Sequence, residues 1–225
     1  PLLLAGSGKG INQQEGFLVT QDIPTDILTK SLGIAVNIQQ VVLQLEGQTD
    51  MDTVIIQGIR ISGVPREEIF VTSKLRNAAH GYQATLEAFD MTLSRLDLRY
   101  LDLYLIHWPR PDAACEEWKE LDRGSWRAME ELYRAGRVRA IGVSNFLPHH
   151  LENLLEVCTV PPMVDQIEFH PGYVQWETVK FCRASQILVE AWSPLGRQRL
   201  ADDPLLAELA ARYQMNLVGG SLVTR

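Results

Sequence analysis

A lysine and a histidine each close an apolar, strand-like run of the sequence. Lys74 ends the run 70–74, and His107 ends the run 103–107 with Trp108 directly after it. A lysine desolvated at a strand end either lowers its pKa or binds an anionic group, although its stem can also extend toward water. A single histidine here is more often a core residue. Together, however, the cation, the ring donor and the aromatic wall predict a site that acts on a polar ligand.

Amide, hydroxyl and indole groups close three further runs. Ser144 and Asn145 follow the run 141–143 and can bond a flat amide group or cap a helix that begins after Pro148. Gln166 lies within a buried-strand pattern, where its side-chain amide needs partners, so a bound ligand is a candidate. Trp192 begins the segment Trp-Ser-Pro-Leu-Gly. Its ring can stack on a planar group or pack in the core.

The elements that must position these residues alternate from about residue 65 onward. Strand-like runs at 69–75, 100–108, 140–145, 164–170 and 187–193 are separated by helical patterns at 82–96, 122–135, 148–157, 176–185 and 204–213. This order predicts βα units and a parallel sheet covered on both faces. The polar residues fall at the carboxyl ends of the strands, where a (β/α)8 barrel gathers its functional groups. The glycine-rich segment 6–10 has neither dinucleotide-fingerprint nor P-loop spacing, so it does not indicate a doubly wound sheet.

Composition narrows the class of protein. The 225 residues carry a net charge of −7 without a basic cluster, which argues against nucleic acid as a partner. Three widely spaced cysteines (Cys115, Cys158 and Cys182) indicate neither a zinc site nor a disulfide framework. No apolar stretch is long enough for a membrane span, and the opening apolar run is too short for a signal peptide. We expect a cytoplasmic, single-domain protein that is a monomer or weak oligomer, with a small-molecule partner.

Five blocks of the sequence, at 63–75, 102–109, 141–146, 166–171 and 192–196, resemble successive strand regions of the aldo-keto reductases. The resemblance is closest to bacterial-type members that act on small aldehydes and diketones, such as the 2,5-diketo-gluconate reductases. It covers residues 58–214 and is weak over 1–57 and 215–225. It implies one (β/α)8 TIM-barrel domain over 1–225, whose last strand and C-terminal tail we expect to be missing from this chain.

The resemblance also implies an activity, the reduction of an aldehyde or ketone to an alcohol by hydride transfer from NADPH. Lys74 matches the lysine that lowers the pKa of a tyrosine acid, and His107 matches the histidine that orients the carbonyl. Trp108 matches an aromatic residue of the substrate pocket. NADP(H) would bind in extended form, held by residues that match the family's cofactor contacts: Ser144, Asn145 and Gln166 at the carboxamide, Trp192 against the nicotinamide, and Ser193 and Leu195 at the pyrophosphate.

The N-terminal part departs from the family pattern. Gln44 stands where the family has an Asp, Thr49 stands where it has the acid Tyr, and no tyrosine precedes Tyr82. Residues 215–225 keep the length of a family segment but not its residues, and the resemblance implies that the family's basic clamp for the 2′-phosphate lies beyond them. Two hypotheses follow: an active NADPH-dependent reductase, or a catalytically degenerate barrel that binds a nucleotide or a partner.

Two other enzyme classes find less support in the sequence. A metal hydrolase needs clustered ligands, yet His107 and His170 lack HxH or HExxH companions. A glycosidase needs two carboxylates at strand ends, and Glu168 and Glu190 lie within or near strands, so that reading stays a weaker alternative.

Overall fold

The strands form one parallel sheet. The computed structural model describes residues 3–4, 64–197, 199–200 and 202–214. The strands of these ranges pair in the order β1-β6-β5-β4-β3-β2. They are β1 (Leu3–Leu4), β2 (Thr72–Leu75), β3 (Leu101–Ile106), β4 (Val138–Ser144), β5 (Val164–Glu168) and β6 (Leu188–Trp192). Every pair is parallel, as the alternation of the sequence predicts.

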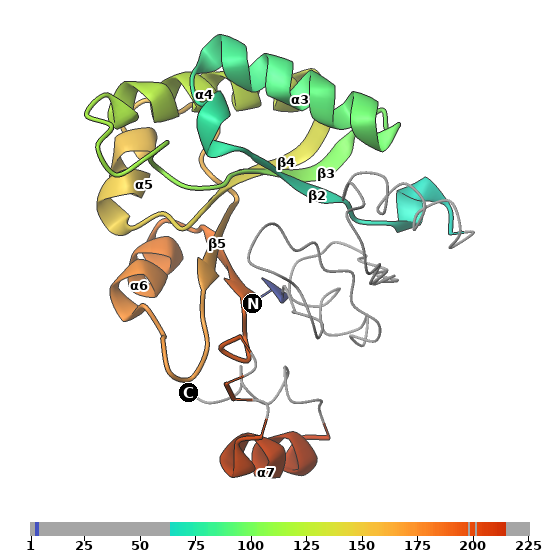
Figure 1. Ribbon diagram of the computed structural model, residues 1–225, viewed down its shortest axis with the longest axis vertical. Coiled ribbons are helices and arrows are strands. Elements are labelled where there is room, and N and C mark those ends of the chain that lie inside the picture. The colour runs from blue at the N-terminus through green and yellow to red at the C-terminus, as the bar shows by residue number, and fades with distance from the viewer. Residues whose placement is uncertain (1–2, 5–63, 198, 201, 215–225) are drawn as a thin grey trace.

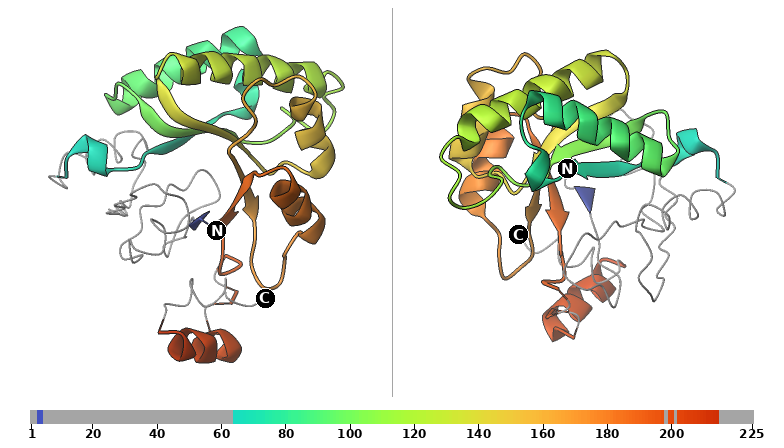
Figure 2. Two further views of the ribbon diagram at one scale, coloured as in Figure 1. Left: turned by 180° about the vertical axis from the view of Figure 1, so that it is seen from behind. Right: turned by 45° about the horizontal axis from the view of Figure 1, so that its top comes forward.

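Helices follow the strands, and four of the five described α-helices cover one face of the sheet. The α-helices are α3 (Tyr82–Leu96), α4 (Trp118–Arg134), α5 (Pro148–Leu155), α6 (Trp176–Ala184) and α7 (Pro204–Arg212), and short 3-10 turns span Arg66–Glu68 and Asn77–Ala79. In Figure 1, α3 and α4 lie side by side across β2, β3 and β4, and α5 and α6 continue along the neighbouring strands. The two views of Figure 2 show the same arrangement. The α/β class predicted from the sequence is confirmed.

Alternate strand residues separate into two apolar clusters. Tyr104, Ile106 and Ile141 belong to the large cluster that packs under the helices. Leu103 and Leu105 belong to a small cluster on the opposite, inner face. Because side chains alternate along a strand, residues two positions apart share a face. The inner face is therefore the one that carries Lys74, paired with Leu105, and His107, two residues beyond Leu105.

Some expected elements lie outside the described ranges. These are the strand-like stretch 41–49, which includes Gln44 and Thr49, the glycine-rich segment 6–10, and 215–225. The single-domain organisation over 1–225 stays a prediction. Among the described residues, no helix is both long and apolar enough to cross a membrane.

Helix α4 begins earlier than the sequence pattern indicates. The predicted start was Asp122, a residue type common at helix N-termini, but the helix begins at Trp118. Asp122 is instead fully buried in the second turn, with Oδ1 3.3 Å from Nδ1 of the buried His80. A tertiary partner thus places this carboxylate inside the helix.

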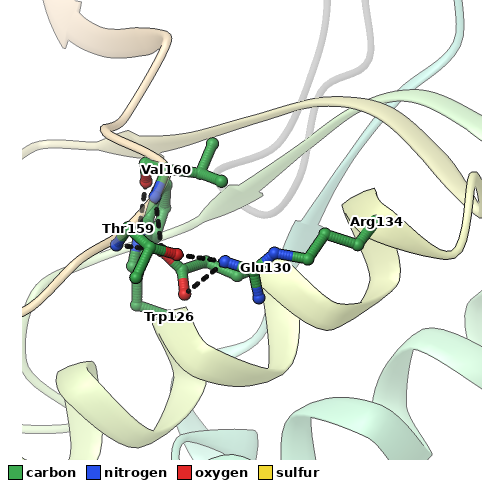
Figure 3. A network of polar contacts seen from close by, with 5 residues as sticks. All are labelled: Trp126, Glu130, Arg134, Thr159 and Val160. Carbon is green, nitrogen blue, oxygen red and sulfur yellow. Dashed lines mark hydrogen bonds and ion pairs between the residues drawn. The ribbon is translucent and has the colours of Figure 1, made fainter.

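A buried carboxylate ties α4 to the loop that follows α5 (Figure 3). Glu130 Oε1 accepts hydrogen bonds from the backbone N–H groups of Thr159 and Val160 at 2.6 and 2.7 Å. Trp126 Nε1 donates to the Val160 carbonyl at 3.0 Å, and Arg134 contacts both Glu130 and Thr159. Burial would raise the pKa of Glu130, but these hydrogen bonds and the Arg134 charge outweigh it and lower the pKa. Glu130 and Trp126 therefore hold the loop through its backbone groups.

The Glu130→Gln variant should lose about 2 kcal/mol of unfolding free energy, because one charge-assisted acceptor serves two backbone donors. Urea denaturation at neutral pH measures this loss. The surface variant Glu120→Gln, on the same helix, is the control and should stay within about 0.5 kcal/mol of the parent. Equal midpoints for the parent and Glu130→Gln would contradict the assigned role.

A second buried acid, Asp165, faces the helices from β5. Its Oδ1 accepts a 3.4 Å hydrogen bond from the Phe146 N–H, and Cys182 Sγ donates to Oδ2 at 3.8 Å. Burial raises the pKa of Asp165 well above its usual range, and these two weak donors offset only part of the effect. Burial therefore disfavours the ionised form of this carboxyl within the fold.

The Asp165→Asn variant should be more stable than the parent at alkaline pH. A raised native pKa gives a contribution that is complete below the unfolded-state pKa of about 4 and is lost as pH rises toward the native pKa. Asn cannot ionise, so its stability advantage over the parent should vanish near pH 4 and grow as the pH rises above it. Urea denaturation across this range tests it, with exposed Asp202→Asn as the control. Parallel stability curves for parent and Asp165→Asn would refute it.

Candidate functional site

The polar residues singled out from the sequence gather on the inner face of the sheet. Strand register aligns Lys74 with Leu105, and Ser144 with Gln166. Gln166 is in turn aligned with Glu190. Directly opposed residues of paired strands point to the same face. The described strands therefore carry a cation, a hydroxyl, an amide and a carboxyl toward one interior, near their carboxyl ends.

His107 is a neutral hydrogen-bonding group in this setting. Desolvation, followed by the nearby Lys74 charge, lowers the pKa of His107 to about 4. A neutral imidazole carries one N–H donor and one acceptor. Its ring centroid lies 6.2 Å from that of Trp108, whose side chain is 43% exposed. The pair thus offers a ring donor beside an open aromatic surface.

Asn145 joins the ends of three strands through its side chain. Its backbone adopts a left-handed conformation, with φ 63°. Nδ2 donates to the His107 carbonyl at 3.0 Å and to Ser144 Oγ at 3.1 Å, and Oδ1 accepts from Trp192 Nε1 at 2.9 Å. Ser144 Oγ donates to the Gln166 carbonyl at 2.8 Å. These bonds set the spacing between the strand ends that carry the site.

The helix-cap alternative for Ser144 and Asn145 is wrong. The N-cap of α5 is Leu147, whose backbone N–H donates to His150 Nδ1 at 3.1 Å. The hydroxyl and the amide are engaged between strands instead. Their local sequence, directly before Phe146, gives no sign of that long-range pairing.

A tight turn follows β6 and contains Ser193 and Leu195. Gly196 N–H donates to the Ser193 carbonyl at 2.8 Å, and both residues have positive φ, of 58° and 50°. Arg197 places its guanidinium carbon 5.6 Å from the Trp192 ring centroid. A turn with a cation beside it is suited to an anionic group such as a phosphate.

A cavity of about 490 Å³ opens at these strand ends. Trp108, Asn145 and Trp192 line it, whereas Lys74, His107, Ser144 and Gln166 lie outside its described lining. Sequence reasoning missed Arg110, His150 and other lining residues, because they come from loops and a helix with no spacing signal.

Glu190 also lies on the inner face of the sheet. The sequence analysis considered this residue only for the glycosidase alternative and not for the reductase site. Burial raises the pKa of Glu190 to about 7, and a hydrogen bond from Gln166 and the Lys74 charge oppose the rise. The sequence feature that could have identified it is an acidic residue within an otherwise apolar strand. Glu190 alternates with Leu188 and Trp192, so the three side chains share one face.

The two weaker alternatives gain no support from the geometry. Glu168 Oε1 lies 3.7 Å from His170 Nε2, while Glu190 bonds Gln166, so each carboxylate has its own partner. Within residues 64–214, excluding 198 and 201, no group of three or more His, Cys, Asp or Glu side chains is placed to hold a metal ion.

Comparison with known proteins gives a consistent result. A family model described as "Aldo/keto reductase family" matches residues 52–211. A glyoxal reductase of Bacillus subtilis is 49% identical over 160 residues, which is 71% of this chain and 55% of that protein. An aldo/keto reductase structure from Brucella melitensis has a TM-score of 0.66 at 42% identity, over 74% of this chain and 62% of the other.

A Bombyx mori aldo-keto reductase solved in complex with NADP has a TM-score of 0.63 at 34% identity, over 74% of this chain and 59% of the other. The chain spans about half the length of the curated relatives it matches.

Proposed function

The chain belongs to the aldo/keto reductase family, and on this basis we propose that it reduces a small aldehyde or ketone to the alcohol with NADPH. The observation that carries the proposal is the convergence of Lys74, His107 and Gln166 on one inner face, beside the cavity lined by Trp192. Fold alone would not support an activity, since one fold hosts many functions.

The residues present fit a nicotinamide group. Gln166 is a 4% exposed amide on the inner face, and Trp192 offers a half-buried indole at the next strand end. A side-chain amide can bond a carboxamide, and an aromatic ring can stack on a planar heterocycle. The turn at Ser193, with Arg197 and Arg199 after it, suits the phosphates. The cofactor, when bound, supplies the hydride.

The protein's own contribution is position and polarity. Neutral His107 can donate a hydrogen bond to a carbonyl oxygen, which stabilises the negative charge that develops there. Lys74 adds a positive charge to the same interior, as its effect on His107 shows. Trp108 forms one wall of the cavity in which the substrate would lie. The NADP complex of the Bombyx mori relative supports this choice of cofactor.

Steady-state assay of the full chain with NADPH and glyoxal tests the proposal. Glyoxal is the probe because a relative is named glyoxal reductase. We expect NADPH consumption at about 1 s⁻¹ or faster, with the alcohol product identified by mass spectrometry. The departures at Gln44 and Thr49 favour a second candidate, a nucleotide-binding barrel without turnover. NADPH binding with no alcohol formed from glyoxal or other small carbonyls would select that candidate.

A further inference from the structure

A row of three polar side chains crosses the inner face of the sheet. Glu190 on β6 is directly opposed to Gln166 on β5, and Gln166 to Ser144 on β4. Ser144 and Gln166 are buried, and Glu190 is partly buried. An acid on the inner wall of a sheet requires compensating partners. The family resemblance assigns no role to this acid.

Glu190 has partners on two elements. The Gln166 side chain donates a hydrogen bond to its carboxylate, and the Lys74 ammonium on β2 is the opposing charge. The charge of the same lysine helps to lower the pKa of His107, the residue that directly follows β3, and the His107 ring is neutral. Lys74 and His107 share this interior with Glu190 as charged or titratable groups. Ser144 and Gln166 share it as hydrogen-bonding groups, and Glu168, two residues beyond Gln166 on β5, adds a second carboxyl to the same face.

The contact with Glu190 determines the orientation of the Gln166 side-chain amide. An ionised carboxylate has only acceptor atoms, so the NH₂ end of the amide must face Glu190. The carbonyl end, Oε1, is then turned away from Glu190. Without that carboxylate, the amide can present either end to a ligand, because its two ends have nearly the same shape.

We propose that Glu190 is a positioning residue that holds Gln166 with Oε1 directed at the carboxamide NH₂ group of the bound nicotinamide. The inference rests on the proposed function, because it assumes that Gln166 meets the nicotinamide. Glu190 itself acts through Gln166 and does not touch the reacting atoms. It makes the site selective for the carboxamide over a group of similar shape that lacks the NH₂ donor.

Proton uptake by Glu190 changes this arrangement. A neutral Glu190 carboxyl can donate a hydrogen bond to Oε1 of Gln166. The amide can then turn its NH₂ group, instead of Oε1, toward the ligand. The pKa of Glu190, raised to about 7, places the change near neutral pH. The ordering of Gln166 is complete above this pKa and is lost below it. His107, with a pKa of about 4, does not titrate in that interval.

The test compares two dinucleotides that share every phosphate and ribose group. NADP⁺ carries the carboxamide, whereas its 3-acetylpyridine analogue carries a methyl ketone and has no NH₂ donor. Dissociation constants are measured by calorimetry on the full chain. The parent should prefer NADP⁺, and Glu190→Gln should narrow that preference by about five- to tenfold. The preference of the parent should also decline below about pH 7, and that of Glu190→Gln should not.

Two further variants keep the test decisive. Glu152→Gln, exposed on α5, is the matched control and should behave as the parent. The double variant Gln166→Leu/Glu190→Gln should have the same preference for NADP⁺ over the analogue as Gln166→Leu alone. In Gln166→Leu the amide through which Glu190 acts is already absent.

Each remaining outcome counts against a specific claim. A purely structural role for Glu190 would weaken both dinucleotides equally, and that result, or an unchanged preference, overturns the inference while leaving the reductase proposal intact. Failure of the parent chain to bind NADP⁺ at all overturns both.

Discussion

The His107→Phe variant should reduce glyoxal with a kcat/KM about 10²- to 10³-fold below that of the parent, while its affinity for NADPH stays unchanged. Phenylalanine keeps a planar ring next to Trp108 but removes both ring nitrogens. The lost interaction is the donor to the carbonyl oxygen, which matters most when negative charge develops in the transition state. Steady-state kinetics and a separate binding measurement distinguish the two effects.

His149→Phe is the matched control for this prediction. His149 is exposed on α5, and its ring centroid lies 3.8 Å from that of His150, near the cavity but away from the inner face. Its kcat/KM should lie within about twofold of the parent. A similar loss in both variants would show that disturbance of the surrounding aromatic side chains, and not the loss of the His107 donor, lowers the rate.

The pH dependence gives a second check on His107. Its pKa of about 4 keeps the ring neutral from mildly acidic to alkaline pH. Ionisation of this ring therefore should not appear in the kcat/KM profile near the ordinary histidine pKa of about 6.5. An inflection near pH 7 that arises from Glu190 should disappear in Glu190→Gln. An inflection near neutral pH that persists in that variant and disappears in His107→Phe would contradict the neutral-donor assignment.

The sequence was sufficient to predict the strands β2 to β6 and the polar residues that lie near their carboxyl ends, but not β1. Lys74 and His107 were found because each ends an apolar run, and parallel strands bring such ends to one edge. Gln166 was found because an amide inside a buried strand needs a partner. These signals are local, so no knowledge of strand pairing was required.

What could not be predicted depends on register and tertiary contact. The role proposed for Glu190 depends on its alignment with Gln166, and the pairing of β5 with β6 sets that alignment. The sequence left two roles open for Asn145, and it could not show that a left-handed backbone turns the side-chain amide toward His107 and Trp192. Asp122 looked like a helix start, yet His80, 42 positions earlier, draws it into the packed interior. Each case involves a partner distant in sequence.

Gly142→Ala should destabilise the fold by about 3 kcal/mol, because the inner face leaves no room for a methyl group there. A Cβ at this position would lie 2.5 Å from the Val164 carbonyl oxygen and 2.8 Å from Leu105 Cδ2. The leucine can rotate, but the carbonyl belongs to the β5 backbone. Relief therefore requires β4 and β5 to separate at the row that precedes Ser144 and Gln166.

Separation of β4 and β5 should change dinucleotide selectivity as well as stability in this variant. Ser144 bonds the Gln166 carbonyl at 2.8 Å, and a wider spacing weakens this bond and disturbs the amide that Glu190 orients. Gly142→Ala should therefore also lose selectivity for NADP⁺ over the acetylpyridine analogue at temperatures where it remains folded. The control is Gly172→Ala, whose Cβ would meet only the His170 ring at 3.4 Å, with an expected change within about 0.5 kcal/mol. Equal urea midpoints for these two alanine variants would mean that β4 and β5 have room between them, contrary to the inner-face packing on which the site depends.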